Sequence, residues 1–113
     1  MKNIHLLLWT LAACTNSFAA GGADQIAVGK VVFDRWCAAC HAALPFRPGT
    51  ASLAVKYGNT MPAALEERTN LPPAVVSTFV RYGVLSMPSF RKTEITDAEL
   101  EALGAYLGRN TPK

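Results

Sequence analysis

Apolar residues recur at helical spacing near both ends of the chain. The first such segment runs from about Ala27 to Cys40. The residues on its shared face are Gly29, Val32, Phe33, Trp36, Cys37 and Cys40. The last segment follows a Thr96-x-x-Glu99 capping box and closes at Gly108. Its apolar repeat consists of Leu100, Leu103, Tyr106 and Leu107. A glycine inside a helix costs about 1 kcal/mol relative to alanine, so Gly29 predicts a close contact with another helix.

Shorter elements are expected in the middle of the chain. Prolines and a glycine make residues 42–49 a predicted loop. Thr50 then serves as the expected N-cap of a helix over residues 51–57, which stops at Gly58. A further turn or two is expected after Thr60.

A clearer helix begins at residues 71–73 and runs to about Tyr82, where Gly83 ends it. Residues 84–95 are expected to form a loop. No segment shows the sustained alternation of a strand, and the chain contains no internal repeat. The predicted fold class is therefore all-α, with several short helices and longer ones at the two ends.

The first 19 residues have the pattern of an export signal. A positive start precedes an apolar run over residues 4–13, which is shorter than the roughly 20 residues of a membrane-spanning helix. Residues 17–19, Ser-Phe-Ala, fit the rule for cleavage after Ala19. We expect a flexible lead-in over residues 20–26 and one folded domain over residues 27–113, exported to the periplasm.

A lipoprotein signal is the alternative for this segment. Residues 11–14, Leu-Ala-Ala-Cys, resemble a lipobox, in which the cysteine is lipidated and becomes the new N-terminus. The mature chain would then be anchored to a membrane face through Cys14, without a transmembrane span. In both cases Cys14 lies outside the folded domain and needs no disulfide partner.

Length and charge narrow the possible functions. The chain has 113 residues, enough for one domain that buries a modest fraction of its surface, so a bulky apolar cofactor would help its core. Its formal charge is +3, and removal of Lys2 with the signal leaves +2. Because there is no strong basic block, nucleic acid is not an expected partner.

The chemistry-bearing motif is Cys37-Ala38-Ala39-Cys40-His41. Two cysteines three positions apart lie near each other on a helical turn, so their thiols can add to the two vinyl groups of one haem, while His41 binds the iron. A redox dithiol or half of a zinc site would use the same two cysteines. A zinc site takes about four ligands, however, and the mature chain offers only these three residues.

A methionine is the expected second ligand of the iron. His5 leaves with the signal, which excludes a second histidine from the same mature chain. Met87 lies in the loop between two predicted helices, far enough along the chain to return over the opposite haem face, and we prefer it to the alternative, Met61. Without a sulfur ligand the iron would be open to small molecules.

Two further roles follow from the neighbours of these ligands. The carbonyl of Pro48 is a candidate to hold the second ring nitrogen of His41. The alternative is that Pro48 and Gly49 form only a turn. Residues flanking Met87 form an expected partner surface. This predicted partner surface consists of Ser86, Pro88, Phe90, Arg91 and Lys92. The alternative for Arg91 and Lys92 is a solvated pair before a helix.

These residues resemble those of class I c-type cytochromes. The resemblance rests on the Cys37–His41 motif after a helix with Gly29 and Phe33, on Met87-Pro88, and on a last helix with Leu103 and Tyr106. It implies one covalent haem c on Cys37 and Cys40, iron ligation by His41 and Met87, and terminal helices that cross at a glycine and an aromatic residue.

The segment Tyr82–Phe90 also resembles the cytochrome subunits of p-cresol methylhydroxylase and related enzymes that oxidise alkylphenols. That resemblance implies a cytochrome that is not an enzyme on its own and accepts electrons one at a time from a flavoprotein dehydrogenase or hydroxylase. The segment 50–71 departs from the pattern. The alternatives are a free or lipid-anchored electron shuttle between respiratory partners and, ranked last, a haem sensor or peroxidase.

Overall fold

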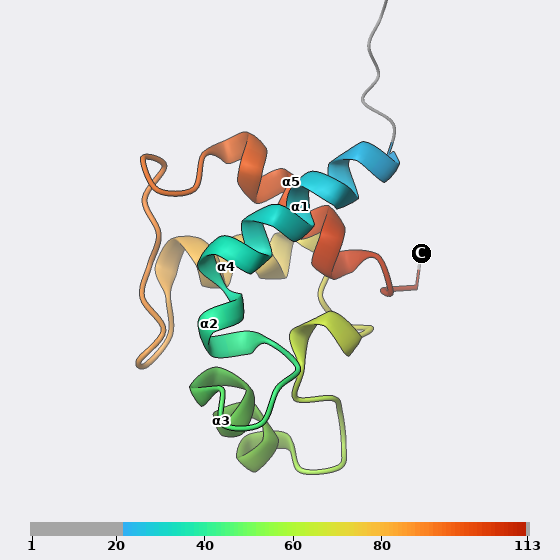
Figure 1. Cartoon of the computed structure of the whole chain (residues 1–113), viewed down its shortest axis with the longest axis vertical. Helices are drawn as coiled ribbons and strands as arrows, with labels where there is room; N and C mark the ends of the chain where they lie inside the picture. The colour runs from blue at the N-terminus through green and yellow to red at the C-terminus, as the bar shows by residue number, and fades with distance from the viewer. Residues whose placement is uncertain (1–21, 113) are drawn as a thin grey trace, which may run out of the picture.

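The first and last helices of the described chain, residues 22–112 of a computed structural model, cross at the centre of the molecule (Figure 1). They are α1, Gly22–Trp36, and α5, Asp97–Gly108. A side chain on Gly29 would overlap the carbonyl group of Ala102 and would lie 2.6 Å from Cβ of Tyr106. The rings of Phe33 and Tyr106 meet beside this point, with centroids 5.8 Å apart. The expected close contact at Gly29 is confirmed.

The helix α1 begins five residues earlier than the sequence predicts. Residues 22–26 are helical, so the expectation of a flexible lead-in is wrong for them. Asp24 lies in the first turn, where a carboxylate interacts favourably with the helix dipole, and Ile26 packs against the core. The expected signal sequence and Cys14 lie outside the described residues.

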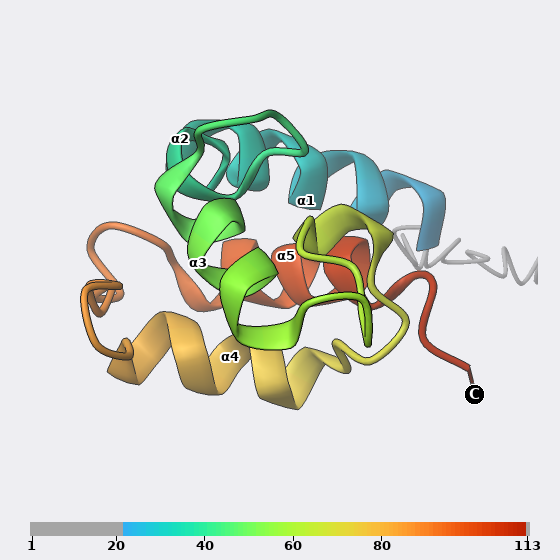
Figure 2. The same ribbon diagram turned by 90° about the horizontal axis from the view of Figure 1, so that it is seen from below.

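The core forms where α4, Pro73–Tyr82, packs beside α5 (Figure 2). Val76 and Val80 of α4 and Leu103 of α5 are buried in it. The predicted capping box of α5 is confirmed, because Thr96 Oγ1 accepts from the backbone N–H of Glu99 and the Glu99 carboxylate accepts from the backbone N–H of Thr96. The predicted bounds of α4 are confirmed as well.

The helix α3, Pro48–Tyr57, begins before its expected start. Its N-cap is Arg47 and not Thr50. Pro48 occupies the first helical position, where its fixed φ suits a helix and its missing N–H costs nothing. The hydroxyl of Thr50 instead donates to the carbonyl of Ala42, 2.9 Å away, and ties α3 to the preceding loop.

The short 3₁₀ helix η1, Leu65–Glu67, connects α3 to the core. The hydroxyl of Tyr106 donates to the carboxylate of Glu66. The side chains of Arg109 and Asn110 both donate to the carbonyl of Glu66 at 3.0 Å. These bonds fasten η1 to the end of α5.

Regular structure within residues 22–112 is helical, apart from an isolated bridge between Val84 and Met87. The predicted all-α fold is confirmed. None of the helices in this range is long and apolar enough to cross a membrane.

Candidate haem-binding site

The two cysteines and the histidine of the motif share one tight turn of backbone. Cys37 follows α1 directly, and α2, Ala38–His41, continues from it. The carbonyl of Cys37 accepts from the backbone N–H of Cys40 at 3.0 Å and of His41 at 2.8 Å. Both cysteines are free thiols, with Cys37 half-buried and Cys40 exposed. These backbone hydrogen bonds place the two cysteines and the histidine on one turn, as attachment to a single haem requires.

The state of the Cys37 thiol argues against a redox dithiol. Burial, and then the neighbouring Cys40, raise the pKa of Cys37 to about 11. A nucleophilic cysteine of a redox Cys-x-x-Cys pair has a lowered pKa instead. Among residues 22–112, moreover, no group of three or more His, Cys, Asp or Glu side chains is gathered as a metal cluster.

The imidazole of His41 packs against the start of α3. A side chain on Gly49 would lie 2.6 Å from Cε1 and 2.8 Å from Nδ1 of His41, so only glycine fits there. Nδ1 is fully enclosed and has no hydrogen-bond partner among the described residues. Burial, and then the charge of Arg68, lower the pKa of His41. This lowered pKa favours the neutral ring, which is the form that binds iron.

The expected hydrogen bond from His41 to the carbonyl of Pro48 is not formed. Pro48 is the first residue of α3, and its carbonyl accepts from the hydroxyl of Ser52 at 2.8 Å, along the helix. The structure does bring Gly49, the residue after Pro48, to the edge of the ring.

Met87 lies in a tight hairpin directly after α4. Val84 and Met87 exchange two backbone hydrogen bonds of 3.1 and 2.9 Å, and Leu85 turns the chain at φ +51°. Gly83 adopts φ +66°, and a side chain there would lie 2.5 Å from the carbonyl oxygen of Met87. The backbone of Met87 is thus fixed by its own loop, and its side chain is partly buried.

Contacts on both sides hold this loop near the motif (Figure 1, orange). The ring of Phe90 meets Trp36, the residue before Cys37, edge to face at 5.9 Å. Arg81 donates to the carbonyls of Phe90 at 3.1 Å and Ile95 at 2.9 Å. The structure therefore brings the Met87 loop and the haem motif to the same end of the molecule.

The alternative ligand, Met61, is engaged elsewhere. Its sulfur lies 3.8 Å from Nδ2 of Asn70, a weak hydrogen bond that comes from the segment after η1. No comparable partner engages the sulfur of Met87 among the described residues.

The predicted partner surface is only partly exposed. Ser86 and Pro88 are exposed, whereas Phe90 is partly buried and packs against Trp36 and the core. Arg91 and Lys92 are exposed and ion-paired with acids of their own neighbourhood: Arg91 with Glu94 at 3.5 Å and Lys92 with Asp97 at 2.7 Å.

Exposed apolar side chains that the sequence analysis did not single out lie nearby. Tyr82, Val84 and Leu85 are exposed around the hairpin, and Phe46 is exposed in the loop after the motif. The sequence does contain a sign of this exposure for Tyr82, Val84 and Leu85. They lie at or next to a predicted loop, where apolar side chains do not belong to the buried face of a helix.

Apolar side chains of α3 and α4 remain uncovered by the polypeptide, and a bulky apolar group could cover them. No residue of α3 is buried, although Leu53, Ala54 and Val55 are apolar. Phe79 of α4 is 44% exposed. Together with the two thiols, the imidazole of His41 and the partly buried Met87, these surfaces fit a covalently attached haem.

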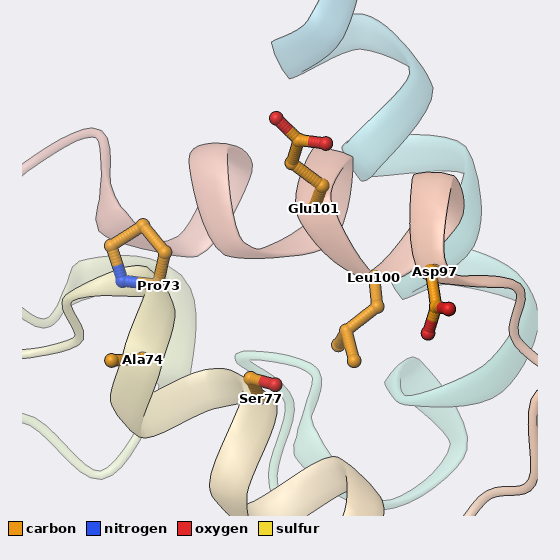
Figure 3. Close-up of a pocket in the computed structure, with 6 residues that line it drawn as sticks. All are labelled: Pro73, Ala74, Ser77, Asp97, Leu100 and Glu101. Atoms are coloured by element: carbon orange, nitrogen blue, oxygen red, sulfur yellow. The ribbon is translucent and has the colours of Figure 1, made fainter.

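A separate groove lies between α4 and α5 (Figure 3). Its lining residues are Pro73, Ala74, Ser77, Asp97, Leu100 and Glu101. None of these carries a thiol, imidazole or thioether, so the groove offers no haem ligand.

The comparisons with known proteins agree with this chemistry. Residues 24–107 match the family model described as cytochrome C oxidase, cbb3-type, subunit III. No curated protein and no solved structure matches the chain. The matched range includes most of both terminal helices, the Cys37–His41 motif and the Met87 loop. The chain therefore belongs to the cytochrome C oxidase, cbb3-type, subunit III family, and it is a class I c-type cytochrome that transfers electrons through one covalently bound haem c.

Proposed function

We propose that Cys37 and Cys40 attach the haem, that His41 and Met87 bind its iron, and that the mature protein carries single electrons in the periplasm. The observation that carries this assignment is the single turn that joins two free thiols to an imidazole packed against the start of α3. The engagement of the Met61 sulfur by Asn70 favours Met87 as the second ligand.

The chain contributes fixed geometry to this function. Bound haem supplies a one-electron couple between ferric and ferrous iron. Gly49 and the first turn of α3 hold the His41 ring, and the Gly83 hairpin holds the backbone of Met87. Because both supports are backbone contacts, the two side chains need little movement when the charge of the site changes by one.

We further propose that the electron donor is a flavoprotein dehydrogenase or hydroxylase acting on alkylphenols or similar substrates. The resemblance of the segment Tyr82–Phe90 to cytochromes of that kind supports this choice. The exposed apolar residues Tyr82, Val84 and Leu85 lie in the same segment, and they offer a small apolar contact of the size that transient redox complexes use.

The test is a pull-down of the tagged protein from periplasm at low salt, with the eluate scanned for haem and flavin absorbance. Co-elution of a flavoprotein in fixed ratio, with haem reduction on addition of an alkylphenol, is the expected result. A Leu85→Ser variant should lose the flavoprotein while it keeps its haem spectrum. Elution of the cytochrome alone would contradict the flavoprotein assignment.

A second candidate is an electron shuttle toward a respiratory oxidase, favoured by the family description itself. Such a shuttle predicts weak encounters that salt disrupts and a cytochrome that oxidase-containing membranes oxidise directly. The mass of the exported chain distinguishes a free protein from a membrane-anchored one. A free protein would have the mass expected for cleavage after Ala19, and an anchored protein would carry a diacylglycerol adduct on Cys14.

A further inference from the structure

Arg81 ties the loop that carries Met87 to both helices that flank it. It lies in the last turn of α4, and its side chain is 17% exposed. Its Nη1 donates to the carbonyls of Phe90 at 3.1 Å and Ile95 at 2.9 Å. Its Nη2 lies 2.9 Å from Oδ1 of Asp97, in the first turn of α5 (Figure 3). One guanidinium therefore joins α4 and α5 to two points of the loop.

The Met87 loop, residues 83–96, has little else to hold it where the chain returns from Met87. The two residues between Met87 and Phe90 are exposed. The backbone N–H of Phe90 donates to the carbonyl of Val80 at 2.8 Å. Among the described residues, Arg81 is the one side chain outside the loop that donates a hydrogen bond to the loop backbone. The position of the returning segment therefore depends on Arg81.

The character of these bonds makes Arg81 the main side-chain anchor. Hydrogen bonds from a charged donor are stronger than neutral ones, and this guanidinium is largely shielded from water. Its planar fork reaches three acceptors at once, which the point charge of a lysine does not do. Lys92 of the loop also pairs with Asp97, at 2.7 Å, but its side chain is 73% exposed, so water and salt weaken that pair.

We propose that Arg81 is a positioning residue for the iron ligand Met87: it holds the loop closed and thereby limits how easily an external ligand replaces the methionine sulfur. This proposal rests on the haem ligation proposed above. In the exchange, the bond between the Met87 sulfur and ferric iron breaks, a bond to the external ligand forms, and the iron keeps its oxidation state. Opening the loop gives the carbonyls of Phe90 and Ile95 to water, whereas the closed loop needs Arg81 to satisfy them.

The primary test is binding of imidazole to the ferric holo-protein at pH 8, in Arg81→Leu, Arg81→Lys and a matched control, Lys30→Leu. Lys30 forms an exposed pair with Asp34 on α1, so the control removes the same charge far from the loop in sequence. Observed affinity scales with the fraction of open loop. We expect Arg81→Leu to bind imidazole about tenfold more tightly, which is about 1.4 kcal/mol in the opening equilibrium. Arg81→Lys should fall between, and Lys30→Leu should stay within about twofold of the parent.

Urea titration separates positioning of the loop from a merely structural role. The long-wavelength charge-transfer band reports the bond between sulfur and iron, and circular dichroism reports the helices. We expect Arg81→Leu to lose the band at a lower urea concentration than its helices, with a wider gap than in the parent protein. Hydrogen exchange should show the same selective loosening, with a faster rate at the Phe90 amide and unchanged rates in α1. Equal shifts of both transitions would overturn the proposal.

Two further outcomes complete the test. If Arg81→Leu does not accumulate as holo-protein, Arg81→Lys carries the test, and imidazole binding within about twofold of the parent would overturn the proposal. A parent protein that has the charge-transfer band, with Arg81 variants that bind imidazole as Lys30→Leu does, overturns this inference alone. A parent protein without the band contradicts the proposed ligation by Met87 itself.

Discussion

The crossing of α1 and α5 allows a sharp prediction for Gly29→Ala. Alanine at a helix interior gains about 1 kcal/mol over glycine by propensity. The new methyl group, however, would overlap the Ala102 carbonyl and lie 2.6 Å from Cβ of Tyr106. Overpacking costs about 1–3 kcal/mol, and here the upper end applies because one neighbour is backbone that cannot rotate away. We expect a net loss of about 2 kcal/mol in the free energy of unfolding.

Urea and thermal unfolding of the holo-protein, followed by circular dichroism, measure this loss. For a domain of this size the expected fall in Tm is roughly 10 °C. The control is Gly22→Ala, where a side chain would meet nothing within 4 Å, and its stability should change by less than about 0.5 kcal/mol. A Gly29→Ala protein as stable as the parent would refute the close helix crossing.

Two other predictions concern the site and the last helix. Gly49→Ala places a methyl group against Cε1 and Nδ1 of His41. We therefore expect a displaced ring, a lower yield of holo-protein and an altered ferric absorbance spectrum. A spectrum and a yield equal to those of the parent protein would contradict this packing. The backbone N–H of Thr96 and then its hydroxyl lower the pKa of Glu99, so the stability this carboxylate confers is present above its unfolded pKa and is lost as pH falls through its folded pKa. Glu99→Gln should therefore flatten the acid limb of the stability–pH curve between about pH 5 and 3, and an unchanged limb would exclude the capping role.

The sequence predicts those parts of the fold that local chemistry decides. Neighbours within one turn decide the capping box at Thr96 and the end of α4 at Gly83. The helix contact at Gly29 is predictable because glycine inside a helix lowers its stability and therefore needs a reason. The starts of α1 and α3 were wrong because more than one residue can begin a helix, and in α3 Pro48 takes the position that Thr50 also suits.

The candidate site divides in the same way. The turn that joins Cys37, Cys40 and His41 follows from five consecutive residues. The packing of Phe90 against Trp36 depends on segments about 50 residues apart, which periodicity does not relate. The sequence patterns therefore predict a place for Phe90 on the partner surface but do not predict its contact with Trp36.

The central claim is a haem held by Cys37 and Cys40 with iron bound by His41 and Met87. The most direct measurement is the long-wavelength absorbance of the ferric holo-protein, where a charge-transfer band reports the bond between sulfur and iron. We predict that Met87→Ala abolishes this band and that Met61→Ala, the matched control, retains it. Loss of the band in Met61→Ala with retention in Met87→Ala would contradict the assignment.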